Sequence, residues 1–157
     1  MNFNLKRKNI YLLIFIYSIT AILSAIYIEK VLGYLPCKLC IYQRIPFLLA
    51  IFICFLGYNY FKSDRILIAL IITFTLSTTL AGYHFAIENS ILEEYAGCTN
   101  TNIDIINKEK IIENLGMVKN CKDVEFTISG ISLSGMNFLT SLLIVLFSLR
   151  ALVYEKD

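Results

Sequence analysis

Charged residues are scarce in this chain, since only 17% of its 157 residues are Asp, Glu, Lys or Arg. The formal net charge is +2 and no basic run is longer than residues 6–8, which argues against nucleic-acid binding. The sequence also has no phosphate-binding loop, no Ser-His-Asp set and no dinucleotide-binding fingerprint. Hydrophobic residues make up 57% of the chain, and the mean hydropathy is +0.68. This composition is too apolar for an ordinary soluble domain and predicts an integral membrane protein in contact with lipid.

Four long apolar runs each approach the ~20 residues that a helix needs to cross a bilayer core. They cover about residues 10–28, 45–61, 66–87 and 132–152. The sequence therefore predicts a single all-α membrane domain, a four-transmembrane-helix bundle with loops over about residues 29–44 and 88–131. Within the second loop, apolar residues near helical spacing between positions 102 and 116 predict a short amphipathic helix.

The orientation of this bundle follows from its lysines and arginines, because cytoplasmic flanks of membrane helices carry the excess of them. Basic residues precede the first run, follow the fourth and occupy the link at residues 62–65. The loop at 88–131 is acidic overall, whereas the loop at 29–44 carries Lys30, Lys38 and Arg44 and is weak evidence against this orientation. On balance we expect both termini in the cytoplasm and both loops outside.

Five cysteines are present, and four of them fall in the two outer loops: Cys37, Cys40, Cys98 and Cys121. Thiols in an oxidising compartment tend to pair. From spacing alone, the Cys-x-x-Cys at residues 37–40 suits redox exchange, a metal site or a static disulfide. Four loop cysteines allow three pairings, so spacing does not decide the connectivity. The fifth, Cys54, lies inside the second apolar run and is expected to be a small buried hydrophobe without chemistry.

A longer pattern surrounds the first cysteine pair. Residues 36–46, PCKLCIYQRIP, resemble the first periplasmic loop of the disulfide bond formation protein B (DsbB) family of membrane quinone reductases. Residues 82–88, GYHFAIE, are similar to a family segment at the outer end of the third span, with Ala86 where a glycine is common. Residues 120–123 and 130–137, NCKD and GISLSGMN, resemble the second-loop cysteine and the entry to the fourth helix.

The resemblance implies a relay of cysteines that oxidises a periplasmic thiol:disulfide oxidase of the DsbA type. The partner's dithiol would attack the second-loop disulfide at Cys98, and Cys121 would pass the exchange on to the first-loop pair. Cys37 would be the sulfur that exchanges with the second loop. Cys40 would be the thiolate that donates electrons to quinone. The implied place is the bacterial inner membrane.

The resemblance also implies a cofactor, ubiquinone or menaquinone, and no metal. Arg44, four residues after Cys40, is expected to stabilise both the thiolate and the quinone oxygen. His84 is the only histidine, and with Glu88 one helical turn away it could line the quinone pocket or pass protons. An interfacial anchor for Arg44 and a buried structural role for His84 are the plainer alternatives.

Two other classes of function remain open from the residues. A sister enzyme of the same family, devoted to a single substrate, would carry the same motifs. A metal-binding or structural membrane protein would use Cys37 and Cys40 as ligands instead of as a redox pair. Vitamin K-type reductases also couple cysteine pairs to quinones, but their pair lies near the last span, whereas this one joins the first two.

The expected topology can be tested at Ser63, inside the short basic link between the second and third runs. A cysteine introduced by Ser63→Cys should react with a membrane-impermeant thiol reagent only after the membrane is opened. Reduced Cys98 and Cys121 should be labelled from outside in intact cells. Labelling of position 63 from outside would invert the topology.

Overall fold

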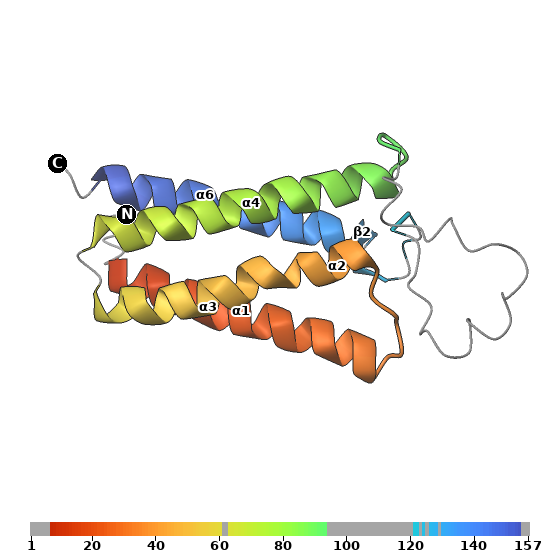
Figure 1. The fold of residues 1–157 in the computed structure, drawn as a ribbon, viewed down its shortest axis with the longest axis horizontal. Helices are drawn as coiled ribbons and strands as arrows, with labels where there is room; N and C mark the ends of the chain where they lie inside the picture. Colours follow the sequence, from red (N-terminus) through yellow and green to blue (C-terminus); the bar gives the residue numbers. More distant parts are fainter. Residues whose placement is uncertain are drawn as a thin grey trace, which may run out of the picture.

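The computed structural model describes residues 7–60, 63–93, 121–122, 124, 126–128 and 130–154. Cys98 and the amphipathic helix expected between positions 102 and 116 lie outside these residues. The described part of the chain forms four membrane-length spans that run side by side, with a two-stranded hairpin at one end (Figure 1). The first span begins and the fourth ends at the opposite end of the bundle (Figure 1).

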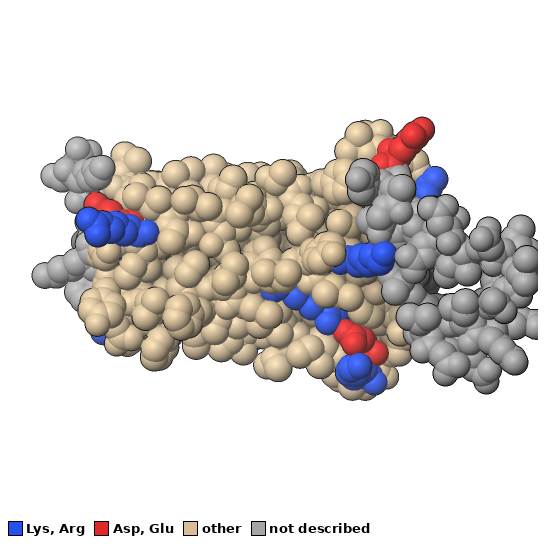
Figure 2. Space-filling view, in the orientation of Figure 1, with Lys and Arg blue, Asp and Glu red and all other residues tan. Residues whose placement is uncertain are grey.

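The spans are built from five helices. They are α1 (Arg7–Lys30), α2 (Lys38–Tyr42), α3 (Arg44–Asn59), α4 (Asp64–Glu88) and α6 (Leu133–Tyr154). Helix α2 leads directly into α3, and together they make the second span. All four spans are long and apolar enough to cross a bilayer, so the chain is the four-helix membrane bundle that its sequence predicts. On the face in Figure 2, charged side chains gather toward the two ends and a broad uncharged band lies between them.

The helices pack in two pairs. Helix α1 lies along α3, α4 lies along α6, and contacts between α3 and α4 join the pairs (Figure 1). Helices α1 and α6 touch at few points, one of which is the hydroxyl of Tyr17, donating to Oγ1 of Thr140 at 2.7 Å. The bundle is therefore tightly packed on three sides and loosely closed between α1 and α6.

The tightest packing lies toward the end of the bundle away from the hairpin. Tyr11 of α1 is fully buried against Gly57 of α3, where an added Cβ would stand 2.6 Å from the tyrosine ring. Small residues let membrane helices approach this closely. Cys54 is 1% exposed in the same core, as its sequence position predicts. At this end an ion pair of 2.6 Å between Arg7 and Asp64 joins α1 to α4.

The second span begins earlier than the apolar run that starts near residue 45. Cys37 caps α2, because its Sγ accepts a hydrogen bond from the backbone N–H of Cys40 at 3.1 Å. Pro46 falls in the first turn of α3, where its missing N–H costs no helical hydrogen bond. Residues 38–42 and 44–46 are thus helical and begin the second span, although the sequence predicts a loop as far as residue 44.

The hairpin sets the start of the last helix. Strands β1 (Thr127–Ile128) and β2 (Ile131–Ser132) pair antiparallel around a tight turn. Gly130 has a φ of +82°, a value that favours glycine because it has no Cβ. Helix α6 follows at once from Leu133. Its packing along α4 brings its first turn beside the end of α4 that carries Glu88.

Candidate redox site

The cysteine pair at the start of the second span is the centre of the candidate site. The sulfurs of Cys37 and Cys40 lie 2.6 Å apart, in a hydrogen-bonding contact in which either can donate. Cys37 is buried, with 5% of its surface exposed, and Cys40 is half-buried. Because one sulfur caps the helix and the other stands one turn along it, the Cys-x-x-Cys spacing itself brings them together.

A cysteine from the second loop joins this pair. Cys121 is 1% exposed and packs in one buried cluster with Cys37, Leu39 and Ile87. The structure therefore brings Cys121 to the first-loop cysteine that the sequence resemblance assigns to exchange. Its expected partner, Cys98, lies outside the described residues.

The surroundings of Cys37 oppose its ionisation. Hydrogen bonding to the sulfur of Cys40, followed by burial, raises the pKa of the Cys37 thiol well above its usual range. Two sulfurs in such contact share one proton more readily than they release both. Any step that turns Cys37 into a thiolate therefore needs help from a neighbouring group.

His84 is the neighbour placed to give that help. Its Nε2 lies 3.6 Å from the Sγ of Cys37 and 3.5 Å from Oε1 of Glu88, one turn along α4. The pairing of His84 with Glu88 that their spacing predicts is thus present. The hydroxyl of Ser134, in the first turn of α6, donates to the other carboxylate oxygen, Oε2, of Glu88. All three side chains are largely buried, so the carboxylate and the imidazole are held in place by protein groups.

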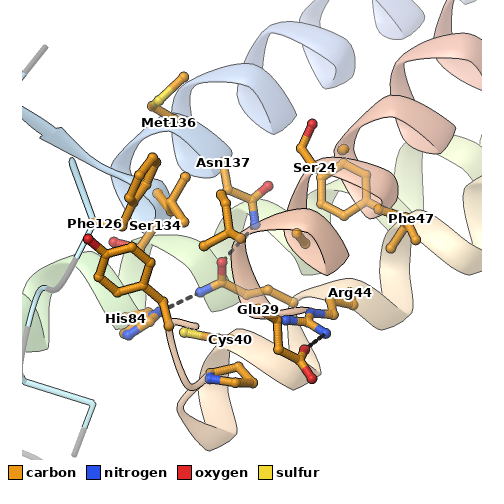
Figure 3. A pocket seen from close by; sticks show the side chains of 18 of the residues that line it. Ser24, Glu29, Cys40, Arg44, Phe47, His84, Phe126, Ser134, Met136 and Asn137 are labelled. Atoms are coloured by element: carbon orange, nitrogen blue, oxygen red, sulfur yellow. Dashed lines mark hydrogen bonds and ion pairs between the residues drawn. The ribbon is translucent and has the colours of Figure 1, made fainter. Parts of the chain in front are cut away.

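A chain of amides and hydroxyls continues from the far side of the imidazole. Gln43 donates from Nε2 to Nδ1 of His84 at 2.8 Å, and Asn137 donates from Nδ2 to Oε1 of Gln43 at 2.8 Å (Figure 3). Ser141 donates to Oδ1 of Asn137 at 2.9 Å, and Ser77 lies 3.1 Å from Ser141. These bonds connect the second, third and fourth spans through side chains alone.

Arg44 follows Gln43 and turns toward α1. Its Nη1 donates to Oε2 of Glu29 at 2.7 Å, and both side chains are half-buried (Figure 3). Glu29 also lies 3.1 Å from Lys30. Arg44 stands one helical turn from Cys40, on the same span, so its positive charge is near that sulfur while its hydrogen bond goes to Glu29.

A cavity of about 390 Å³ lies beside these groups, between α1 and the first turns of α6. This volume is within the range of sites for small molecules and cofactors. Its walls are mostly apolar (Figure 3). Its polar lining includes the site residues Glu29, Cys37, Cys40, Gln43, Arg44, His84, Glu88, Ser134 and Asn137. An apolar chamber with donors and sulfurs in its lining suits a quinone, whose ring carries two carbonyl oxygens and whose tail is a hydrocarbon.

A metal is the other group that these residues could hold. The ligand atoms of Cys37, Cys40 and His84 all lie within 4.8 Å of one another. Two sulfurs and an imidazole nitrogen are typical zinc ligands, but the nitrogen must present a lone pair to the ion.

Four residues of the site were not expected from the sequence: Glu29, Gln43, Ser134 and Asn137. Gln43, Ser134 and Asn137 stand inside the stretches that carry the family resemblance, and polar side chains at membrane depth are candidates for interhelical hydrogen bonds. That general signal could have pointed to them. It could not have named their partners, because each partner lies on another helix.

The chain is similar to known proteins over nearly its whole length. A family model described as "Disulfide bond formation protein DsbB" matches residues 7–151. A relative from Rickettsia prowazekii (strain Madrid E), named "Uncharacterized protein RP370", is 27% identical over the whole chain and over 96% of its own length. The matched region contains the cysteines, Arg44, His84 and Glu88.

The contact between Cys37 and Cys121 can be tested by cross-linking. With Cys40→Ala and Cys98→Ala combined, mild oxidation should join Cys37 to Cys121, because the two thiols pack in one cluster. Mass spectrometry of non-reduced peptides would identify the bond. Adding Cys121→Ala leaves Cys37 with Cys54, and no intramolecular disulfide should form. Failure of Cys37 and Cys121 to join would contradict their placement.

Proposed function

The chain belongs to the DsbB family, and from this premise we propose that it oxidises a periplasmic dithiol protein of the DsbA type and passes the electrons to a membrane quinone. Family membership and the four spans make it a multi-pass membrane protein of the disulfide-forming machinery, with an oxidoreductase role. The dithiol partner, the quinone and the residues that serve them are our proposal.

One observation carries this proposal. The second-loop Cys121 packs in one buried cluster with Cys37, and both sulfurs of the Cys37–Cys40 pair line the cavity, Cys40 being the more exposed of the two. The cysteine pair therefore stands between a sulfur of the second loop and a chamber for an acceptor. This placement supports a relay that enters through the second loop and leaves at the cavity, and the family resemblance assigns the exit to Cys40.

The relay is a series of thiol–disulfide exchanges in which each bond that forms replaces one that breaks. A partner thiolate attacks Cys98 of the Cys98–Cys121 disulfide, and Cys121 leaves as a thiolate. Cys121 attacks Cys37, a Cys37–Cys121 bond replaces the Cys37–Cys40 bond, and Cys40 leaves with the electron pair. The partner's second thiolate then displaces Cys98, which attacks Cys121 and releases Cys37. The partner ends oxidised, and the two electrons end on Cys37 and Cys40.

The acceptor site is the cavity beside Cys40. A bound quinone, ubiquinone or menaquinone, would accept two electrons and two protons while the Cys37–Cys40 disulfide is restored. In this proposal Arg44 supplies fixed donors and a permanent charge where negative charge develops. His84 and Glu88, in the lining of the same cavity, hold and move protons.

The proposed setting is the bacterial inner membrane, with both termini in the cytoplasm and the redox loops in the periplasm. The ion pair of Arg7 with Asp64 and the basic link at 62–65 then lie at the cytoplasmic end. The site groups lie at the other end, where a soluble partner can reach the second loop. A sister enzyme serving one dedicated substrate would use the same site and differ only in its partner.

The order of the relay predicts opposite defects in two variants. Cys98→Ala should abolish oxidation of the partner but leave Cys37 and Cys40 oxidisable by quinone, because entry and exit use different pairs. Cys40→Ser should block quinone reduction and trap partner-linked protein. Quinone absorbance and non-reducing gels measure the two steps, with Cys54→Ala as a control that turns over normally. Normal turnover in Cys98→Ala or Cys40→Ser would refute the relay.

Variants can distinguish a role of Arg44 in quinone binding from its role in the ion pair with Glu29. Arg44→Gln should raise the quinone KM about tenfold or more, since a hydrogen bond to a charged group contributes about 1.5–3 kcal/mol. Arg44→Lys should be milder because it keeps the charge. Glu29→Gln breaks the same ion pair but retains the guanidinium, so its loss should be smaller. Equal losses in Arg44→Gln and Glu29→Gln would make Arg44 an anchor for α1 and not a quinone ligand.

A further inference from the structure

The amide chain behind His84 runs in one direction in the structure. Oδ1 of Asn137 faces Ser141 and accepts its hydroxyl hydrogen, and the amide nitrogen of Asn137 faces Gln43. Oε1 of Gln43 accepts that bond, which leaves its NH2 group facing Nδ1 of His84. An NH2 group cannot accept a hydrogen bond, so Nδ1 must present its lone pair.

A neutral imidazole carries one proton, and the hydrogen bond at one ring nitrogen decides where that proton sits. With Nδ1 accepting from Gln43, the proton lies on Nε2. This is the nitrogen that stands 3.6 Å from Sγ of Cys37 and 3.5 Å from Oε1 of Glu88. The proton therefore lies near a sulfur and a carboxylate, both of which can accept it.

We propose that Gln43 and Asn137 are positioning residues, which hold His84 as the Nε2–H tautomer so that it donates a hydrogen bond to Cys37 when that sulfur leaves as a thiolate. The inference rests on the proposed function for the step that it serves. In that step the thiolate of Cys98 attacks Cys121. The Cys37–Cys121 bond breaks, and Cys37 takes the electron pair. A leaving thiolate that gains a hydrogen bond leaves faster.

The burial of the chain explains why it can hold one tautomer. Gln43 is 7% exposed and His84 3%, while Ser77 and Ser141 are fully buried. Asn137 is half-buried and lines the cavity with Gln43, but both amides have partners inside the protein, and turning one of them alone leaves donors facing donors. The direction can reverse only if Gln43 and Asn137 turn together, which would move the proton to Nδ1.

The same tautomer bears on metal binding. A metal held by Cys37, Cys40 and His84 needs the lone pair of Nε2, and the amide of Gln43 keeps a proton there. The positioning chain therefore favours a redox pair over a metal site at the same atoms.

His84 is the only histidine of the chain, so the tautomer can be measured without assignment by 15N NMR of protein labelled at histidine. In the oxidised wild type at neutral pH, Nε2 should carry the proton and Nδ1 should be unprotonated. Gln43→Glu offers an acceptor in place of the donor and should move the proton to Nδ1. A proton on Nδ1 in the wild type, protons on both nitrogens, or no change in Gln43→Glu would overturn the inference.

Two smaller substitutions test the same inference with less risk of misfolding. Ser141→Ala removes only the hydroxyl that orients Asn137, and should give a mixture of tautomers. Ser148→Ala makes the same change two turns further along α6, at a buried hydroxyl without a hydrogen-bond partner among the described residues, and should match the wild type. Identical spectra from Ser141→Ala and the wild type would also count against the inference.

Kinetics provide the second measurement. Gln43→Leu should slow single-turnover oxidation of a reduced dithiol partner about tenfold, the size of one hydrogen bond to a charged group, with little change in the quinone KM. An unchanged rate would refute the role of the tautomer in releasing Cys37. Quinone reduction by the wild type is followed in parallel. Its absence would contradict the proposed function. The tautomer of His84 is decided separately, by the position of the proton in the NMR spectrum.

Discussion

The polar groups inside this bundle must satisfy one another, because lipid offers them no hydrogen bonds. Toward the end that carries the cysteine pair, side chains from three spans meet this requirement together, from the hydroxyl of Ser77 to the sulfur of Cys37. Each group in the series is within hydrogen-bonding distance of the next. Removing one of them leaves a buried partner without that bond, which costs more than the bond itself contributes. The relative placement of the helices and the chemistry of the cysteine pair therefore depend on the same set of bonds.

The two ends of the bundle are stabilised in different ways. Away from the site, aromatic and aliphatic side chains pack around Tyr11 and Phe74, and Gly57 allows α1 to approach α3 closely. At the site end, polar bonds replace much of this packing, and a cavity separates α1 from α6. Many aliphatic side chains on the outer face, such as Leu76, stay exposed, as expected for a surface that lipid covers. Close packing thus holds one end while the other keeps room for a ligand.

The sequence predicts the four spans and the cysteine motif well, because apolar length and Cys-x-x-Cys spacing are local signals. It also predicts the pairing of His84 with Glu88, since four residues make one helical turn. It misses the earlier start of the second span, because the cap at Cys37 is a side-chain bond that hydropathy cannot reveal. It misses Gln43, Glu29 and Asn137 as partners, because their bonds join residues that are far apart in the chain. The second-loop helix stays a prediction outside the described residues.

The ion pair of Glu29 with Arg44 has a mechanical consequence. It ties the end of α1 to the start of α3, so both ends of the intervening segment are fixed. Within that segment Cys37 is further held by its bond to the backbone of Cys40. The first loop is therefore joined to the bundle at both ends, and Cys37 is held at one position in it. A relay through Cys37 would keep this sulfur in place while its bonding partner changes between Cys40 and Cys121.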